Sequence, residues 1–163
     1  MGKVDDNMMY DVRFLEISEW EDAMEMVYRT FLEFDAPMFS PEGIEHFREY
    51  ISDSVLKRMF IAGSFQVVAA YSGTKIIGVI ALRNNSHISL LFVDSGFHRK
   101  GIGRRLVSEL SDYVRLKLKG SFLTVNSSPY AVDFYKRIGF LPLNHSLTES
   151  GITYTPMKMI FGE

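Results

Sequence analysis

The sequence predicts a mixed α/β fold in which helices pack on one β-sheet, within a single domain spanning residues 1–163. The apolar residues repeat at helical spacing in most of the first 63 positions and at strand-like spacing from Phe65 onward. The chain of 163 residues is long enough for one hydrophobic core and hardly for two. Its 47% hydrophobic and 23% charged residues are the usual globular mixture.

The first part of the chain is predicted to form one strand and then three helices. Val12–Ile17 is the strand, and Ser18 followed by Glu21 has the spacing of a capping box that would begin the first helix. Ser40 and Pro41 are the cap and first-turn residues of a second helix. The first helix is expected to end near residues 35–37, and a short third helix to cover 54–60.

The second part of the chain alternates strands with two helices. Its predicted strands are 65–71 and 75–82, joined as a hairpin, then 87–93, 121–125, 140–143 and 152–160. Its predicted helices are 100–119 and 129–138, the second closed by Gly139. The complete predicted order is therefore βαα(α)βββαβαββ.

Composition excludes several classes of protein. The chain has no cysteine, which removes disulfide scaffolds, thiolate metal centres and cysteine nucleophiles, and no metal site is predicted. A net charge of −2 argues against a nucleic-acid partner. No stretch approaches the ~18 apolar residues of a membrane span. Residues 1–6 lack a secretory leader, and Asp6 stands where a myristoylation motif at Gly2 needs Ser or Thr. A cytoplasmic protein without a membrane partner is expected.

The charges are distributed unevenly along the chain. Residues 1–63 hold 14 acidic and 6 basic side chains, whereas residues 98–119 hold 7 basic and 2 acidic ones. A basic segment at a helix start is suited to an anionic ligand, and an acidic segment to a cationic one. The alternative for the acidic segment is a set of solvated helix faces.

The most informative stretch runs from Leu90 to Leu106, where a buried-type strand enters a glycine loop that opens a long helix. The first amides of a helix lack internal partners, and Gly101 and Gly103 let such amides approach phosphate oxygens. The surrounding cations are Arg99, Lys100, Arg104 and Arg105. A dinucleotide-binding fingerprint fails because Leu106 occupies its third glycine position, and a P-loop fails because no Gly-Lys-Ser/Thr follows.

This stretch resembles the GNAT superfamily of acetyl-CoA-dependent N-acetyltransferases, whose signature Gln/Arg-x-x-Gly-x-Gly/Ala corresponds here to His98–Gly103. His98 departs from the usual Gln or Arg. The resemblance implies a mixed, largely antiparallel central sheet with helices on both faces. It also implies that acetyl-CoA is the cosubstrate and that its pyrophosphate binds at Arg99, Lys100, Gly101, Ile102, Gly103 and Arg104. The preceding strand is expected to splay and to offer the backbone of Leu91, Phe92 and Val93 to the pantetheine arm.

A second stretch, from Asn126 to Phe140, resembles the other signature of the same family. Ser128 is expected to cap the helix that carries Tyr135. The resemblance implies that Tyr135 is the general acid for the departing thiolate and that Asn126 lies beside the acetyl and pantetheine groups. On spacing alone, Tyr135 can equally be a core aromatic and Asn126 a turn residue.

Acyl transfer to an amine requires a base, because a free alkylamine has a pKa near 10.4. His87 stands near the start of the cofactor strand, where the family often has its base, and it can equally point to solvent. Glu33 and Asp35 are the alternatives, and they are also the expected acceptor-binding residues. Backbone N–H groups of Phe92 and Val93 are expected to bind the developing oxyanion.

The function implied by the resemblance is transfer of an acetyl group to a primary amine by direct attack in a ternary complex. The acceptor can be a small amine, an amino acid, a polyamine or a peptide, and the acidic helices would favour a cationic one. The alternative is a non-catalytic acyl-CoA-binding sensor or interaction domain of the same fold. A homodimer is compatible with the sequence.

Overall fold

A computed structural model describes residues 10–162, so the expectations for a leader and for Gly2 lie outside the described residues. The helices are α2 (Trp20–Phe34), α3 (Pro41–Ser52), α4 (Ser54–Ala62), α5 (Ile102–Leu116) and α6 (Val132–Arg137). The short 3-10 turns are η1 (Ile17–Glu19), η2 (Ala36–Met38), η3 (Ser95–Phe97) and η4 (Pro129–Ala131). The strands are β1 (Asp11–Phe14), β2 (Phe65–Ser72), β3 (Lys75–Arg83), β4 (His87–Val93), β5 (Phe122–Ser127), β6 (Leu141–Pro142), β7 (Leu147–Glu149) and β8 (Ile152–Ile160).

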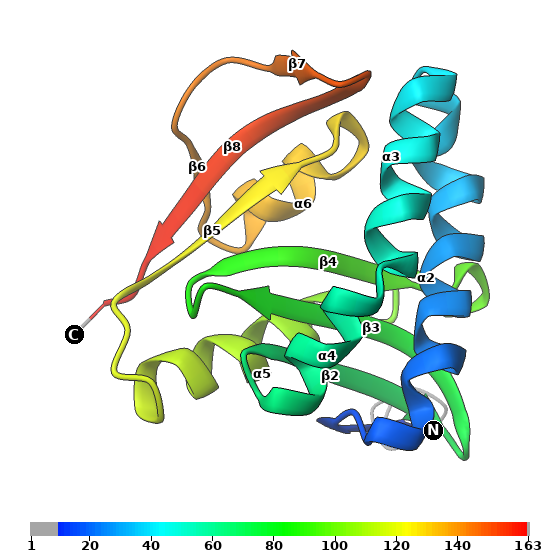
Figure 1. The fold of residues 1–163 in the computed structure, drawn as a ribbon. Helices are drawn as coiled ribbons and strands as arrows, with labels where there is room; N and C mark the ends of the chain where they lie inside the picture. Colours follow the sequence, from blue (N-terminus) through cyan, green and yellow to red (C-terminus); the bar gives the residue numbers. More distant parts are fainter. Residues whose placement is uncertain (1–9, 163) are drawn as a thin grey trace.

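The strands form one sheet in the order β1-β2-β3-β4-β5-β8-β6, with β7 paired to β8. Every pairing is antiparallel except that of β4 with β5. Helices α2, α3 and α4 cover one face of the sheet, and α5 and α6 pack on the other (Figure 1). The predicted mixed, largely antiparallel sheet with helices on both faces is confirmed.

Each face of the sheet has its own hydrophobic core. The core under α2 and α4 includes Trp20, Val27 and Leu56, and the core under α5 includes Leu106 and Leu110. The apolar positions that predicted α5 are all buried, namely Ile102, Leu106, Val107, Leu110 and Val114. The period of the sequence therefore identified which side of this helix meets the sheet. None of the helices in residues 10–162 is long and apolar enough to span a membrane.

The start of α3 agrees with its sequence signal. The Ser40 hydroxyl accepts a hydrogen bond from the Gly43 N–H at 3.1 Å, and Pro41 occupies the first turn. The start of α2 does not agree. Ser18 lies inside the η1 turn, and α2 begins at Trp20. The expected reciprocal pair forms earlier, because the Glu19 carboxylate accepts from the Glu16 N–H at 3.0 Å.

Three further boundaries differ from the sequence prediction. Helix α5 is shorter than 100–119, since Gly101 before it and Lys119 after it both have a positive φ. The helix expected over 129–138 divides into η4 and α6, and the Ser128 side chain makes no capping hydrogen bond. Strand β7 has no counterpart in the prediction. It is held by pairing with β8, a tertiary contact that local periodicity does not report.

The sheet opens between its two parallel strands. β4 and β5 pair only through His87 with Thr124 and Ile88 with Val125, that is, through the first two residues of β4 and the middle of β5. Beyond that point β4 stays on β3, whereas β5 stays on β8. The register of β4 on β3 also shifts at Ser89, which adds one residue to β4. The result is a V-shaped gap whose vertex lies at His87 and Ile88. The strand therefore splays away from its neighbour, as the sequence analysis expected.

Candidate active-site cleft

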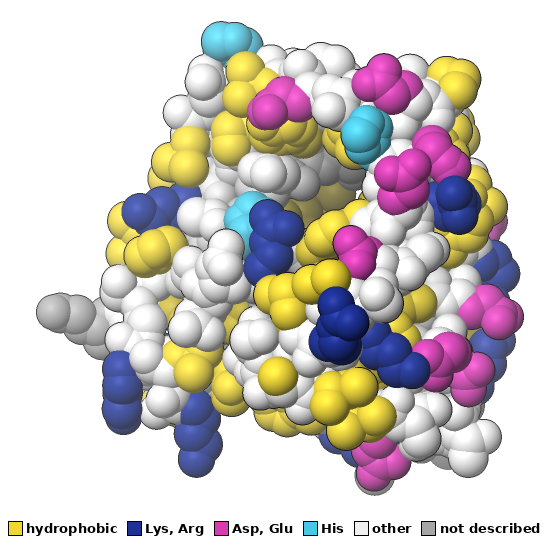
Figure 2. Space-filling model, in the orientation of Figure 1, with side chains coloured by type: hydrophobic (Ala, Val, Ile, Leu, Met, Phe, Trp, Pro, Cys, Tyr) yellow, Lys and Arg dark blue, Asp and Glu magenta, His cyan; other side chains and the backbone are white. Residues whose placement is uncertain are grey.

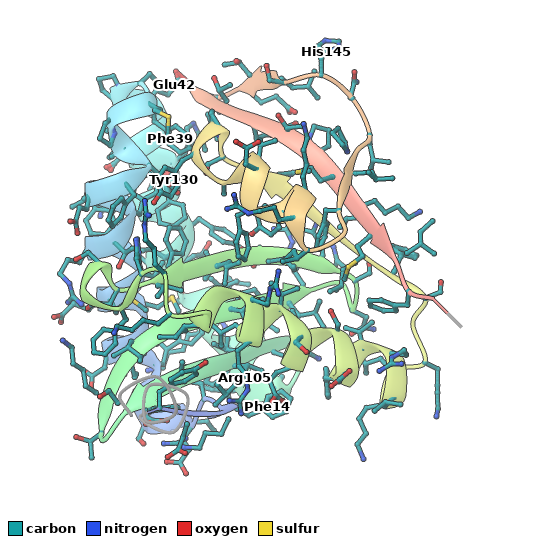
Figure 3. All side chains as sticks on the ribbon, turned by 180° about the vertical axis from the view of Figure 1, so that it is seen from behind. Phe14, Phe39, Glu42, Arg105, Tyr130 and His145 are labelled. Atoms are coloured by element: carbon teal, nitrogen blue, oxygen red, sulfur yellow. The ribbon has the colours of Figure 1, made fainter. Side chains whose placement is uncertain are left out.

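A cleft of about 890 Å³ occupies the V-shaped gap and continues onto the N-terminus of α5. Its size is within the range of ligand-binding cavities. Phe39 and Tyr130, labelled in Figure 3, both line it. The sequence-predicted site residues that line it are Asp35, Leu91, Phe92, Val93, His98, Arg99, Gly101, Ile102, Gly103, Arg104, Asn126 and Tyr135. Those that do not are Glu33, His87 and Lys100.

One end of the cleft is the start of α5. The first backbone bond of this helix runs from the Arg105 N–H to the Gly101 carbonyl at 3.0 Å. The N–H groups of Ile102, Gly103 and Arg104 precede that bond, so they have no partner within the helix and carry its positive dipole end. Gly101 precedes them with a φ of +79°, which glycine adopts without strain. This end of the cleft is suited to an anionic ligand.

Gly103 has a second role at this end. A Cβ on Gly103 would lie 3.2 Å from the Phe134 Cζ atom, closer than nearly all real contacts of that type. The missing side chain therefore lets the Phe134 ring of α6 pack directly on the first turn of α5. The sequence predicted the glycine for its amide, and nothing local to residue 103 indicated the ring of residue 134.

Arginines supply the positive side chains around this end. Arg99, Arg104 and Arg137 line the cleft. Lys100 is exposed outside it. Arg105 pairs with Glu109 at 3.4 Å, and Figure 3 places it on the outer side of α5, away from Tyr130. Of the four cations expected here, only Arg99 and Arg104 therefore line the cleft. Arg137 lines it as well, and the sequence prediction did not include it.

His98 is held by the protein itself. Its Nε2 atom lies 2.6 Å from the Val93 carbonyl oxygen, and its ring packs on Phe34 with 4.7 Å between centroids. The imidazole thus closes the end of β4 against the C-terminal part of α2. His98 lines the cleft while it makes these contacts with Val93 and Phe34.

The backbone of β4 presents alternate residues to the cleft. The Asp94 N–H donates to the Ile77 carbonyl of β3 at 2.9 Å, and Phe92 is in the same register, opposite Val79. Residues two apart on a strand face the same neighbour, so the Phe92 amide also faces β3. The open edge belongs to Leu91 and Val93. The expectation of a Phe92 N–H in the cleft is corrected, and Phe92 instead contributes its ring.

Tyr135 is 4% exposed and lines the cleft from the α6 side. Its ring packs edge-on against Phe134 and Phe140, each at 5.2 Å between centroids. Burial first, and the nearby Asp35 carboxylate second, raise the pKa of the Tyr135 phenol above its usual value. The hydroxyl therefore stays protonated and has a proton to donate.

Asp35 follows α2 directly and faces Tyr135 across the gap. Burial raises the pKa of its carboxyl from 3.8 to about 6. Glu33, two residues earlier, is exposed and outside the cleft. Of the two acidic residues expected at the acceptor site, the structure brings only Asp35 to the cleft.

His87 lies at the vertex of the gap, outside the cleft lining. Its Nδ1 atom is 2.8 Å from the Thr124 hydroxyl oxygen. Burial and the nearby Arg83 lower the pKa of the imidazole below its usual value. The structure does not bring His87 together with Tyr135, because the bonded start of β4 lies at the closed end of the gap.

A charged network that the sequence did not indicate secures the loop before α5. Asp94 accepts from the Gly96 N–H at 3.1 Å and pairs with Arg29 of α2 at 2.9 Å and Lys75 of β3 at 3.9 Å. Burial would raise the pKa of Asp94, but these partners outweigh it and lower the pKa below the usual value. The network joins three elements far apart in the sequence, so no local pattern reports it.

The fold and the cleft define a class of protein. A sheet that opens between one pair of parallel strands, with a free helix start at one end of the gap and a buried tyrosine across it, is the arrangement that the resemblance to N-acetyltransferases implied. A family model described as "Acetyltransferase (GNAT) domain" matches residues 35–161. The chain belongs to the GNAT acetyltransferase family. A sequence comparison with curated proteins found no match.

Solved structures share the fold at low sequence identity. A GCN5-related N-acetyltransferase from Rhodopseudomonas palustris is 18% identical with a TM-score of 0.79, covering 93% of this chain and 95% of its own. The PaiA N-acetyltransferase of Thermoplasma acidophilum, in complex with coenzyme A, is 20% identical with a TM-score of 0.77 (93% and 99%). A mutant of the spermidine N-acetyltransferase SpeG from Vibrio cholerae is 16% identical with a TM-score of 0.66 (94% and 95%).

Proposed function

We propose that this protein is an N-acetyltransferase that moves the acetyl group of acetyl-CoA to a primary amine, within one GNAT domain over residues 1–163. The observation that carries the proposal is a continuous cleft that joins the free amides of α5 to Tyr135 and Asp35. The PaiA structure contains coenzyme A, and SpeG is by name a spermidine N-acetyltransferase, which supports both substrates.

The residues at the α5 end fit a pyrophosphate. The free N–H groups of Ile102, Gly103 and Arg104 point out of the helix start, and Arg99 and Arg104 add charge beside them. The open edge of β4 at Leu91 supplies backbone groups for the amide-containing arm of the cosubstrate. Acetyl-CoA supplies an acetyl thioester, whose carbonyl carbon accepts the amine.

Two kinds of group in this chain would stabilise the negative charge that develops at the thioester and protonate its sulfur. Backbone N–H groups at the open edge of β4, from Leu91 and Val93, are the donors for the oxygen that gains negative charge. The Tyr135 hydroxyl would donate its proton toward the departing sulfur. The amine nitrogen forms the new bond to the carbonyl carbon as the bond from that carbon to sulfur breaks. Since the chain has no cysteine, direct attack in a ternary complex is favoured over a thioester on the enzyme.

Asp35 is the base that the geometry favours. Its carboxylate lines the cleft, as Tyr135 does, and with a pKa of about 6 it is ionised at neutral pH. It can accept the proton that the amine nitrogen loses as it bonds to the carbonyl carbon, because that nitrogen is then far more acidic than a free ammonium. His87 is the weaker candidate, because it lies at the vertex and its Nδ1 is engaged with Thr124. The proton would pass from the amine to Asp35, directly or through one water molecule.

Several acidic side chains of residues 1–63 form ion pairs with basic side chains of the same chain. Glu21 pairs with Lys57, and Glu45 pairs with Arg48. Figure 2 shows several acidic side chains on the side of the molecule that carries α2 and α3. Asp35 is therefore the carboxylate of this segment that lines the cleft, and Asp133 of α6 lines it as well, so these two carboxylates would attract a cationic acceptor.

A direct assay tests the proposal. Acetyl-CoA is mixed with the full chain and a panel of amines, amino acids, polyamines and peptides, and the free thiol is measured. In parallel, the thermal midpoint is recorded with coenzyme A. Thiol release that depends on an amine is expected. Stabilisation by coenzyme A without transfer to any amine would favour the non-catalytic acyl-CoA-binding alternative, and no stabilisation would contradict the cosubstrate assignment.

A further inference from the structure

Arg83 and His87 form a polar site at the vertex of the gap. They are opposite each other in the antiparallel register of β3 and β4, so their side chains lie on the same face of the sheet. Val79 and Ala81 of β3 belong to the core under α2 and α4, which places Arg83, two residues on, on that face as well. The guanidinium also lies over the Tyr50 ring of α3, at 5.9 Å from its centroid.

Three hydrogen-bond donors of this region have no partner in the protein. Within residues 10–162, the Arg83 Nε, the Tyr50 hydroxyl and the Ser89 hydroxyl are buried and make no hydrogen bond. Ser89 lies two residues after His87 on the same strand. Buried polar atoms normally have a hydrogen-bond partner, and a buried donor without one lowers the stability of the protein. These three groups are therefore available to a ligand that reaches the vertex and offers acceptor atoms.

The charge at this site is also unbalanced. No carboxylate in the described part of the chain lies within ion-pair distance of Arg83. Its register partner His87 adds a second nitrogen group rather than an acid. A partly buried guanidinium without a counter-ion is stabilised by a bound anion, for which its planar fork is well suited.

The site is connected to the acetyl-transfer region. Ser89 lines the cleft, whereas Arg83, Tyr50 and His87 lie outside its lining. Leu91 is four residues beyond His87, a distance of about 13 Å along a strand. An acceptor that places its amine near Leu91 would pass Ser89 to place its other end at the vertex.

We infer that Arg83, with Tyr50 and Ser89, determines acceptor specificity by binding an oxyanion group, carboxylate or phosphate, at the end of the acceptor away from its amine. The inference rests on the proposed function, since it assigns the acceptor class of the same cleft. It predicts that amines with a distant carboxylate or phosphate are better acceptors than plain alkylamines or diamines, in spite of the acidic first segment.

The test compares acceptors of matched length: aminohexanoate, aminohexyl phosphate, hexylamine and hexanediamine. The enzyme forms are the wild type, Arg83→Met, Arg83→Lys and a control, Arg115→Met, whose arginine is exposed on α5 and pairs with Asp112. The ratio of kcat/KM for an anionic acceptor to that for hexylamine is expected to fall about tenfold to a hundredfold in Arg83→Met. Arg83→Lys keeps the positive charge but lacks the planar guanidinium that can donate two parallel hydrogen bonds, so it should give an intermediate ratio. The control should match the wild type.

The stronger of the two anionic acceptors identifies the oxyanion, carboxylate or phosphate. Equal use of anionic and plain amines by the wild type, or an unchanged ratio in Arg83→Met, would overturn the inference. A binding measurement separates it from the proposed function. Calorimetric titration with acetamidohexanoate and with acetamidohexyl phosphate is expected to show binding of at least one of them to the wild type and loss of that binding in Arg83→Met. If no amine is acetylated but that difference is found, the anion site stands and the proposed activity fails. If neither compound binds the wild type, or if Arg83→Met binds both as the wild type does, the anion site is refuted.

Discussion

Replacement of Asp35 by asparagine tests the buried carboxylate in two independent ways. Burial raises its pKa from 3.8 to about 6, which corresponds to about 3 kcal/mol of preference for the protonated form in the folded state. Because the folded pKa lies above the unfolded one, the folded protein binds more protons in this window. Stability should therefore fall as the pH rises from about 4 to about 6, and the full cost is present above that window.

The Asp35→Asn variant removes this cost, because the amide carries no charge. At about pH 8 its free energy of unfolding should exceed that of the wild type by up to about 3 kcal/mol, and near pH 4 the two should differ little. Urea unfolding at the two pH values measures both. Glu33→Gln is the matched control: it removes an exposed carboxylate two residues away, outside the cleft, and it should not reproduce the gain in stability at about pH 8.

The same substitution tests the proposed base. In the wild type, kcat/KM for the amine should rise with pH through about 6 as Asp35 ionises. In Asp35→Asn, the rise of kcat/KM through about pH 6 should disappear, and kcat/KM should fall about 10²- to 10⁴-fold. A stability difference that is the same at both pH values would contradict the buried, destabilised carboxylate. Activity that persists with an unchanged pH profile would contradict its role as base.

Three further substitutions test other parts of the cleft. Tyr135→Phe should lower kcat about 10- to 10³-fold while the KM for acetyl-CoA changes little, and steady-state kinetics separates the two effects. Gly103→Ala should raise the KM for acetyl-CoA and cost about 1 kcal/mol of stability, since the new Cβ would meet Phe134 at 3.2 Å; adding Phe134→Leu should restore part of both, and no rescue would refute the contact. Arg29→Met should raise the KM for acetyl-CoA severalfold with kcat retained, because Asp94 and its loop lose their link to α2. An Arg29→Met enzyme with the wild-type KM would show that the loop needs no such support.

Several features of the fold follow from local sequence. β4 has the predicted bounds, the β2–β3 hairpin forms, and Ser40 caps α3 as its position before Pro41 indicated. The glycine loop and the buried side of α5 were also predicted. These signals depend on residues within one or two turns of each other, and steric and capping effects at that range act in the same way in almost any fold.

Local sequence could not show which candidate residues meet. His87 and Asp35 were both candidate bases in the sequence, and the structure places them differently. β4 pairs with β5 only through its first two residues, so His87 lies at the closed vertex, whereas Asp35 lines the cleft. The same holds for the Phe92 amide, whose direction is set by the register on β3.

The sequence by itself determined that this chain can form a free helix start beside arginines, with a strand before it and a tyrosine helix after it. Only the tertiary structure decided what that start faces. It set Phe134 against Gly103 and joined Arg29 to Asp94 across 65 positions. It also placed Arg83 at the vertex, where no carboxylate of residues 10–162 pairs with it. Such contacts depend on strand register and on where the sheet opens, which are properties of the whole packed sheet and not of any short stretch of sequence.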